Sequence, residues 1–132
     1  MKTFYTSHYS LNGRHPKAVS ISARAPHFFK GRWYLDLAPS WGLITAYKFQ
    51  KLSEHDYTDA YLDLIINERK LNPHKVVNDL EDGSMLLCYE PDDGSFCHRH
   101  IVAEWLQRET GIIIEEWKPP KLLTIADELL VF

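Results

Sequence analysis

One segment near the end of the chain limits the folds that this sequence can adopt. Residues 84–90 are apolar and are followed by turn formers, and 98–110 then place apolar side chains at helical spacing. Gly111 is a natural helix end, and the apolar stretch 112–115 follows at once. A strand, a helix and a strand in this order form a βαβ unit, whose two strands run parallel. The sequence therefore predicts an α/β fold: a small, mainly parallel sheet with helices on its faces in Rossmann-like layering.

The preceding part of the chain supplies further elements for the same sheet. Residues 2–9 and 17–22 are rich in strand formers and lie on either side of an Asn12-Gly13 turn. The connector 23–39 is long and irregular, and loops of this length inside compact domains are often functional. Capping serines or prolines open three amphipathic stretches, which are predicted as helices over 39–50, 53–70 and 73–80.

The composition fits a single domain. A chain of 132 residues with 45% hydrophobic residues can bury one core. We expect the α/β domain to cover 1–118 and a C-terminal tail, 119–132, to pack on the domain or on a partner. The net charge of −3 does not support general binding to nucleic acid, which would need a local basic groove.

The sequence also indicates a compartment. No apolar run approaches the ~20 residues that span a bilayer, and residues 1–7 lack the apolar core of a signal peptide. Two cysteines are too few for a disulfide framework. We therefore expect a cytoplasmic protein with reduced thiols and no contact with membranes.

The stretch Cys97-His98-Arg99 carries the most reactive side chains. It lies where the apolar strand passes into the helix, at the sheet edge where ligands usually bind. A helix N-terminus favours anions and stabilises a thiolate, which makes Cys97 a candidate nucleophile beside His98. Arg99 could bind a phosphate or carboxylate through two parallel bonds. The alternative is a half-buried Cys97 that packs between helix and strand, with Arg99 in solvent.

Other polar residues are expected at the same edge. Glu90 ends the apolar strand and could act as a base or orient His98, or it could form a salt bridge to Arg99. Ser7, Ser22 and Arg24 end the two earlier strands, so they would share the rim if those strands are parallel. Arg24 would then add a second positive charge, whereas the alternative is turn capping by the serines and a solvated arginine.

The same place also suggests a metal site. Side chains of the types that zinc prefers are present, but their spacing does not match a compact zinc motif. They are Cys88, Cys97, His98 and His100. We expect no metal and no cofactor, and two free thiols near one another.

Several blocks of sequence occur in an order that resembles a known family. The most specific are Leu86-Leu87-Cys88-Tyr89-Glu90, Cys97-His98-Arg99 and Ala103-Glu104-Trp105-Leu106. Weaker blocks precede them: Ile21-Ser22 with Pro26, Leu37-Ala38-Pro39-Ser40, and Tyr57 with Tyr61. The chain resembles the family catalogued as domain of unknown function number 488. The resemblance implies a small α/β domain with a Cys/His-bearing pocket, and it supplies no reaction.

The leading functional prediction is an enzyme that acts on a small anionic substrate, most readily a nucleotide or a nucleic-acid component. Cys97 would serve as nucleophile or acid, with Glu90 as base or orienting group beside His98. Arg99 and Arg24 would hold the anion. Two alternatives stay open: a non-catalytic module that binds a nucleotide or another anion, and a structural interaction protein.

Overall fold

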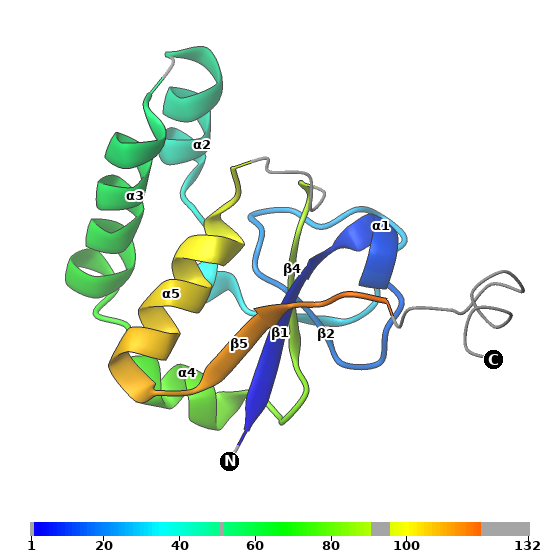
Figure 1. The fold of residues 1–132 in the computed structure, drawn as a ribbon. Helices are drawn as coiled ribbons and strands as arrows, with labels where there is room; N and C mark the ends of the chain where they lie inside the picture. Colours follow the sequence, from blue (N-terminus) through cyan, green and yellow to red (C-terminus); the bar gives the residue numbers. More distant parts are fainter. Residues whose placement is uncertain (1, 51, 91–95, 120–132) are drawn as a thin grey trace, which may run out of the picture.

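The computed structural model describes residues 2–50, 52–90 and 96–119, which form one α/β domain around a five-stranded sheet. The strands are paired in the order β3-β2-β4-β1-β5, and every pair is parallel (Figure 1). They are β1 (Thr3–His8), β2 (Ala18–Ser20), β3 (Arg32–Trp33), β4 (Met85–Cys88) and β5 (Ile113–Glu116). The predicted fold class is confirmed.

The βαβ unit that led to this prediction is present. Strand β4 passes into α5 (His98–Thr110), and β5 follows in the same sheet. Gly111 ends α5 with a φ of 73°, a left-handed conformation that favours glycine. The two strands of the unit are not neighbours, because β1 lies between them, with Tyr5 paired to both Met85 and Glu115. This arrangement makes β4 the middle strand of the sheet.

The helices begin at the residues that the sequence indicates. Ser40 and Ser53 accept hydrogen bonds from backbone N–H groups in the first turns of α2 and α3, and Asn72 does so for α4. The helices are α1 (Tyr9–Asn12), α2 (Trp41–Phe49), α3 (Glu54–Asp63) and α4 (Pro73–Asp79). A short 3-10 helix η1 (Leu35–Leu37) precedes α2, and a π-helix η2 (Leu64–Glu68) continues α3.

The two faces of the sheet are covered differently. Phe4, Leu86 and Ile114 point to the face on which α3, α4 and α5 lie (Figure 1). Met85 and Leu87 point to the opposite face, where they pack with residues of α1 and the connector. The alternation follows the two-residue period of a strand. Helices were predicted on both faces; they cover one face fully, whereas one short helix and a loop cover the other.

The connector 23–39 is less irregular than predicted. Part of it forms β3, a two-residue edge strand that pairs Arg32 with Val19 and Trp33 with Ser20. So short a strand leaves no periodic pattern that the sequence could reveal. The predicted C-terminal tail lies outside the described residues except for Pro119. Among the described helices, none combines the length and apolar character that crossing a membrane requires.

Candidate functional site

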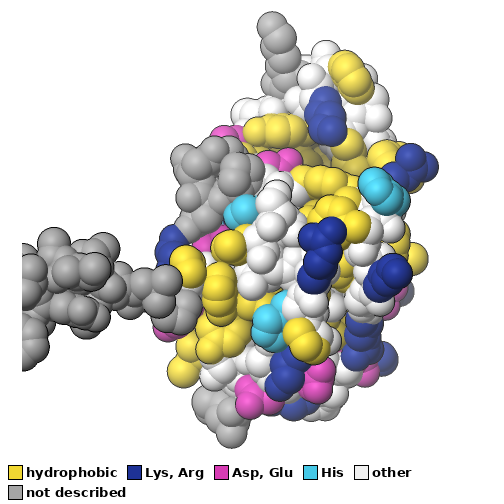
Figure 2. Space-filling model, turned by 90° about the vertical axis from the view of Figure 1, so that its right-hand side faces the viewer, with side chains coloured by type: hydrophobic (Ala, Val, Ile, Leu, Met, Phe, Trp, Pro, Cys, Tyr) yellow, Lys and Arg dark blue, Asp and Glu magenta, His cyan; other side chains and the backbone are white. Residues whose placement is uncertain are grey.

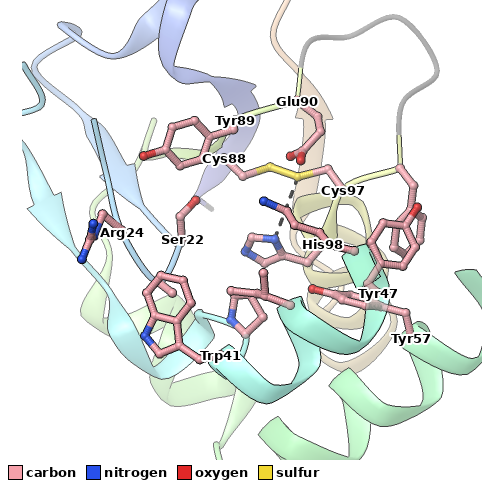
Figure 3. A pocket seen from close by; sticks show the side chains of 15 residues that line it. Ser22, Arg24, Trp41, Tyr47, Tyr57, Cys88, Tyr89, Glu90, Cys97 and His98 are labelled. Carbon is pink, nitrogen blue, oxygen red and sulfur yellow. Dashed lines mark hydrogen bonds between the residues drawn. A yellow bond between two sulfur atoms is a disulfide. The ribbon is translucent and has the colours of Figure 1, made fainter. Parts of the chain in front are cut away.

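A cavity of about 280 Å³ opens where the parallel strands end (Figure 3). Its wall combines residues 22–24 after β2, side chains of α2, residues 88–90 at the end of β4, and residues 96–98 at the start of α5. The predicted convergence is confirmed: β4 is the middle strand, and Cys97 immediately precedes the next helix. This is the edge at which parallel sheets bind ligands.

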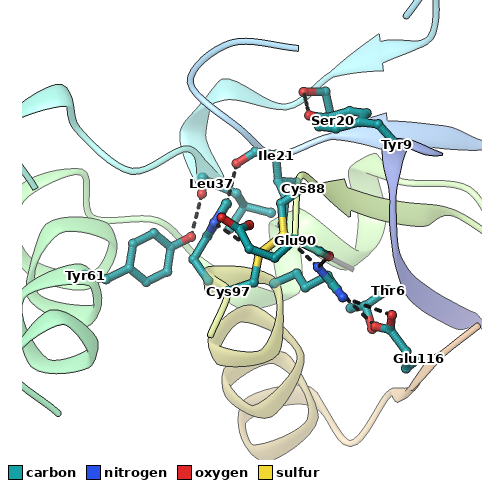
Figure 4. The surroundings of a disulfide bond; sticks show 12 residues. Thr6, Tyr9, Ser20, Ile21, Leu37, Tyr61, Cys88, Glu90, Cys97 and Glu116 are labelled. Carbon is teal, nitrogen blue, oxygen red and sulfur yellow. Dashed lines mark hydrogen bonds and ion pairs between the residues drawn. A yellow bond between two sulfur atoms is a disulfide. The ribbon is translucent and has the colours of Figure 1, made fainter. Parts of the chain in front are cut away.

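The two cysteines meet in the wall of this cavity. Cys88 is the last residue of β4 and Cys97 caps the N-terminus of α5, and both are buried. The structure joins them in a disulfide (Figure 4). The expectation that the sulfurs lie close together is confirmed, and the expectation of reduced thiols is corrected. Both residues end elements at the same edge of the sheet, which brings their sulfur atoms into bonding contact.

His98 is buried beside the disulfide in a fixed orientation. Its Nε2 lies 2.6 Å from the carbonyl oxygen of Ile21, so this nitrogen must carry the proton and donate it. The other ring nitrogen, Nδ1, is therefore an acceptor, and it lies 3.9 Å from Cys97 Sγ. Burial lowers the pKa of His98 to about 4, against the opposing effect of the Ile21 hydrogen bond. The imidazole is thus neutral at pH 7.

Glu90 lies two residues beyond β4, and its side chain lines the cavity. Figures 3 and 4 show it beside the disulfide. The predicted salt bridge to Arg99 does not form, because Arg99 donates to the backbone carbonyl oxygen of Glu90 instead, at 2.6 Å. The Glu90 carboxylate is left facing the cavity.

Arg99 is placed differently from the prediction. Its side chain is fully buried and forms two bonds of 3.1 Å with the Glu116 carboxylate (Figure 4). It also donates to Cys88 Sγ at 3.1 Å. Successive helix residues point about 100° apart, so when Cys97 and His98 face the cavity, Arg99 is directed toward the sheet. Arg99 is therefore held by protein acceptors and does not line the cavity, and the alternative of a solvated side chain is wrong.

The partner of this arginine was missed. Glu116 ends β5 and also accepts a hydrogen bond from Thr6 Oγ1 at 2.6 Å. The sequence did indicate a carboxylate partner for Arg99, since the end of a predicted parallel strand shares an edge with the start of α5. Without the strand register, however, Glu116 could not be chosen over Glu115.

The two serines proposed for the rim have different surroundings. Ser7 is fully buried and donates to Asn12 Oδ1 at 2.5 Å, away from the cavity, so its assignment to a ligand is corrected in favour of a turn contact. Ser22 is buried in the cavity wall, and its Oγ has no hydrogen-bond partner among the described residues. The nearby Tyr9 hydroxyl is bonded to Ser20 Oγ at 2.6 Å, and Ser22 also lies close enough to it to lower its pKa against the larger effect of burial.

Arg24 reaches the cavity as predicted. It is exposed, and its guanidinium carbon lies 5.9 Å from the centre of the Trp41 ring. Lys48 adds a second cation from α2. Elsewhere, on the side of α1 and the connector, Lys and Arg side chains are spread among hydrophobic and uncharged ones (Figure 2). The view shows no continuous basic patch on that side.

An aromatic wall of the cavity was not predicted. Trp41 and Tyr47 come from α2, Tyr57 from α3, and Phe96 precedes α5. The Tyr57 ring centre lies 5.4 Å from that of Tyr47 and 5.2 Å from that of Phe96. Burial and the charge of Glu90 raise the pKa of Tyr57, so its hydroxyl stays protonated. The signal in the sequence was the aromatic residues of α2, among which Trp41 remains more than half exposed.

The same place offers donors for a metal ion in the reduced state. Ligand atoms of Cys88, Cys97 and His98 all lie within 4.8 Å of one another. Two thiolates and an imidazole suit zinc. A disulfide uses the same two sulfurs, so the two states exclude each other.

A family model described as “Active DUF488-N3 subclade” matches residues 12–110. The match includes β2, β4, α5 and the cavity between them. Searches of curated proteins and of solved structures found no match.

Proposed function

The chain belongs to the DUF488-N3 subclade described as active, and from this premise we propose that the cavity is the active site of an enzyme. The substrate is a small molecule with a planar ring and an anionic group, such as a nucleotide or a nucleic-acid component. The carrying observation is that the sulfur of Cys97 lies in the wall of a cavity lined by aromatic rings and cations.

Cys97 is the nucleophile of the reduced enzyme. It caps a helix of 13 residues, whose N-terminus favours the thiolate. His98 Nδ1 faces its sulfur and can accept a hydrogen bond from the thiol, while the bond from Nε2 to Ile21 keeps the ring in place. A reducing cytoplasm would keep Cys97 in the thiol state that this reaction requires.

Glu90 is placed to move a proton on the substrate. Its carboxylate lines the cavity on the same side as Cys97. It can take a proton from an attacking water or return one to a leaving group. Cys97 and Glu90 thus supply covalent and acid–base functions from two neighbouring elements.

The rest of the wall would recognise the substrate. Trp41 and Tyr57 offer ring faces and edges for stacking on a planar group. Arg24 and Lys48 provide positive charge at the rim for an anion. The Ser22 hydroxyl, buried without a partner in the described part of the chain, can donate to a bound ligand.

The disulfide supports a second candidate, a module that binds such a ligand without reacting. With Cys88 and Cys97 joined, the cavity keeps its aromatic and cationic wall but has no free thiol. Binding that persists in oxidised protein, without turnover after reduction, would favour this candidate.

Thiol reactivity tests the enzyme. After reduction, iodoacetamide should modify Cys97 before Cys88. Both line the cavity, but Cys97 lies at the N-terminus of α5 beside His98 Nδ1, whereas Cys88 ends a buried strand. Peptide mass mapping over a pH series gives the order. Equal rates for the two cysteines, or labelling of Cys97 only after denaturation, would contradict the assignment of Cys97 as the nucleophile.

Ligand binding is tested by thermal shift with a panel of nucleotides and inorganic phosphate at fixed ionic strength. A ligand well above its Kd should stabilise the protein by about 1–3 kcal/mol. Arg24→Ala should lose most of this gain. Arg14→Ala is the matched control, because Arg14 is exposed and stacks on Phe28 at 4.4 Å outside the cavity. Equal losses in both variants would place the anion elsewhere.

A further inference from the structure

We propose that Cys97 is a site of reversible oxidation by small hydroperoxides, and that Cys88 is the thiol that resolves the oxidised form as a disulfide. This inference rests on the proposed function in one respect, the reactivity of Cys97. It assigns a role to Cys88 and Arg99, which the proposed reaction does not use.

The fold places the two sulfurs so that they can meet within one chain. Cys88 is held at the end of the middle strand, and Cys97 is held by the first turn of α5. They are nine positions apart in the sequence, and the structure joins them. Because both elements belong to the core of the domain, the pair forms without help from a second molecule.

The two sulfurs have different environments. Cys97 lies at the N-terminus of α5 in the cavity wall, and His98 Nδ1, an acceptor, lies 3.9 Å from its sulfur. Cys88 is only 1% exposed, and Arg99 donates a hydrogen bond to its sulfur at 3.1 Å. Such a bond stabilises a thiolate. Both sulfurs lie in the cavity wall, but only Cys97 lies at a helix N-terminus with an acceptor beside it, so we assign Cys97 as the thiol that meets a reagent and Cys88 as the resolving thiol.

The reaction has two balanced steps. In the first, the Cys97 thiolate attacks one oxygen of the hydroperoxide and the O–O bond breaks. The departing oxygen takes the thiol proton, which leaves a sulfenic acid and water or an alcohol. In the second, Cys88 sulfur attacks Cys97 sulfur, the S–O bond breaks, and the hydroxyl leaves as water with the Cys88 proton. Two thiols are oxidised by two electrons, and the peroxide is reduced.

Burial selects the class of oxidant. Cys97 is 4% exposed, so only a small reagent that enters the cavity can reach its sulfur. Hydrogen peroxide fits this limit, whereas a bulky disulfide such as oxidised glutathione does not. The product removes the nucleophile reversibly and protects it from irreversible oxidation.

The experiment uses the full chain, reduced, desalted and treated with hydrogen peroxide. In wild type, both thiols should be lost to N-ethylmaleimide, with no added oxygen in the intact mass, and dithiothreitol should restore them. Cys88→Ser should instead accumulate a sulfenic acid at Cys97, trapped by dimedone. Cys97→Ser should react at least about tenfold more slowly, because its remaining thiol ends a strand and lacks the helix N-terminus that favours the Cys97 thiolate. Oxidised glutathione should act more slowly than peroxide on wild type.

Three results would overturn the proposal. Dimedone could trap Cys88 rather than Cys97, or wild type could reach a sulfinic acid as readily as Cys88→Ser. The reduced protein could also retain stoichiometric zinc on the two thiols, which would assign the cluster to a metal. If Cys97 of the reduced protein still labels first with iodoacetamide in the first two cases, the proposed function survives while this inference fails. If Cys97 does not label at all, both fail.

Discussion

The first turn of α5 separates two regions with opposite surroundings. On the cavity side, Cys97 and His98 face an open space together with Glu90. On the sheet side, Arg99 is fully buried and binds Glu116 through two parallel bonds. These regions are formed by consecutive residues, so adjacency in the sequence did not establish a shared role.

The difference lies in unused hydrogen-bonding capacity. All three guanidinium nitrogens of Arg99 donate to protein acceptors. Ser22 Oγ, in contrast, finds no partner within the described residues, and Arg24 extends into solvent. Buried polar groups that serve stability are normally satisfied, whereas an unsatisfied one calls for an explanation such as a ligand. We therefore propose that the cavity side is the functional side, and that the Arg99–Glu116 pair holds the first turn of α5 in place.

The largest effect is expected on the sheet side. Arg99→Ala should lower the free energy of unfolding by about 3–5 kcal/mol, because it leaves the Glu116 carboxylate partly buried without its partner. Arg99→Met combined with Glu116→Leu should recover much of the loss, since an apolar pair leaves no charge unpaired. Urea denaturation of the reduced proteins measures both.

Arg24→Ala is the control for this comparison. It should change the free energy of unfolding by less than about 0.5 kcal/mol, because Arg24 is exposed. If Arg99→Ala were equally mild, the ion pair would not support the site. If Arg99→Ala kept its stability and lost only nucleotide binding, the sheet side would be the ligand-binding side and the cavity side would be the structural one.

A smaller effect should follow from the pH dependence of stability. The pKa of His98 is lowered from 6.5 to about 4 in the folded protein, so the unfolded chain takes up its proton first as the pH falls. Stability is full above pH 6.5 and is lost as the pH falls toward 4. The loss between pH 7 and 5 should be about 2 kcal/mol.

His98→Gln tests this assignment, because it cannot titrate. Urea denaturation at several pH values should give a flatter profile for the variant than for wild type. His100, whose pKa is also lowered, chiefly by burial, contributes in the same direction, so His100→Gln is the matched control. An unchanged profile in His98→Gln would mean that His98 is not the group that titrates.

The sequence predicted most of the fold because local signals were strong. Periodicity defined β4 and α5, and Ser40, Ser53 and Gly111 marked helix ends that the structure confirms. Two features of the fold could not be predicted from the sequence. A strand of two residues, β3, carries no period, and the position of β1 between β4 and β5 is set by tertiary packing.

The candidate site was predicted in part. Cys97, His98, Glu90, Ser22 and Arg24 do meet at the predicted edge. Their shared edge follows from parallel strands, so topology alone was sufficient. The direction of each side chain was not predictable, because one step along a helix turns it by about 100°. That step separates Arg99 from the cavity, and strand alternation separates Ser7 from it.

The smallest effect compares the two serines that were expected to act alike. Ser7→Ala should lower the free energy of unfolding by about 1 kcal/mol, because Asn12 Oδ1 loses its buried donor. Ser22→Ala should stay within about 0.5 kcal/mol of wild type, since its hydroxyl bonds to nothing in the described protein. Only Ser22→Ala should reduce the thermal shift produced by a nucleotide. Equal destabilisation by both variants would show that Ser22 has a structural partner, and an undiminished shift would remove Ser22 from the ligand site.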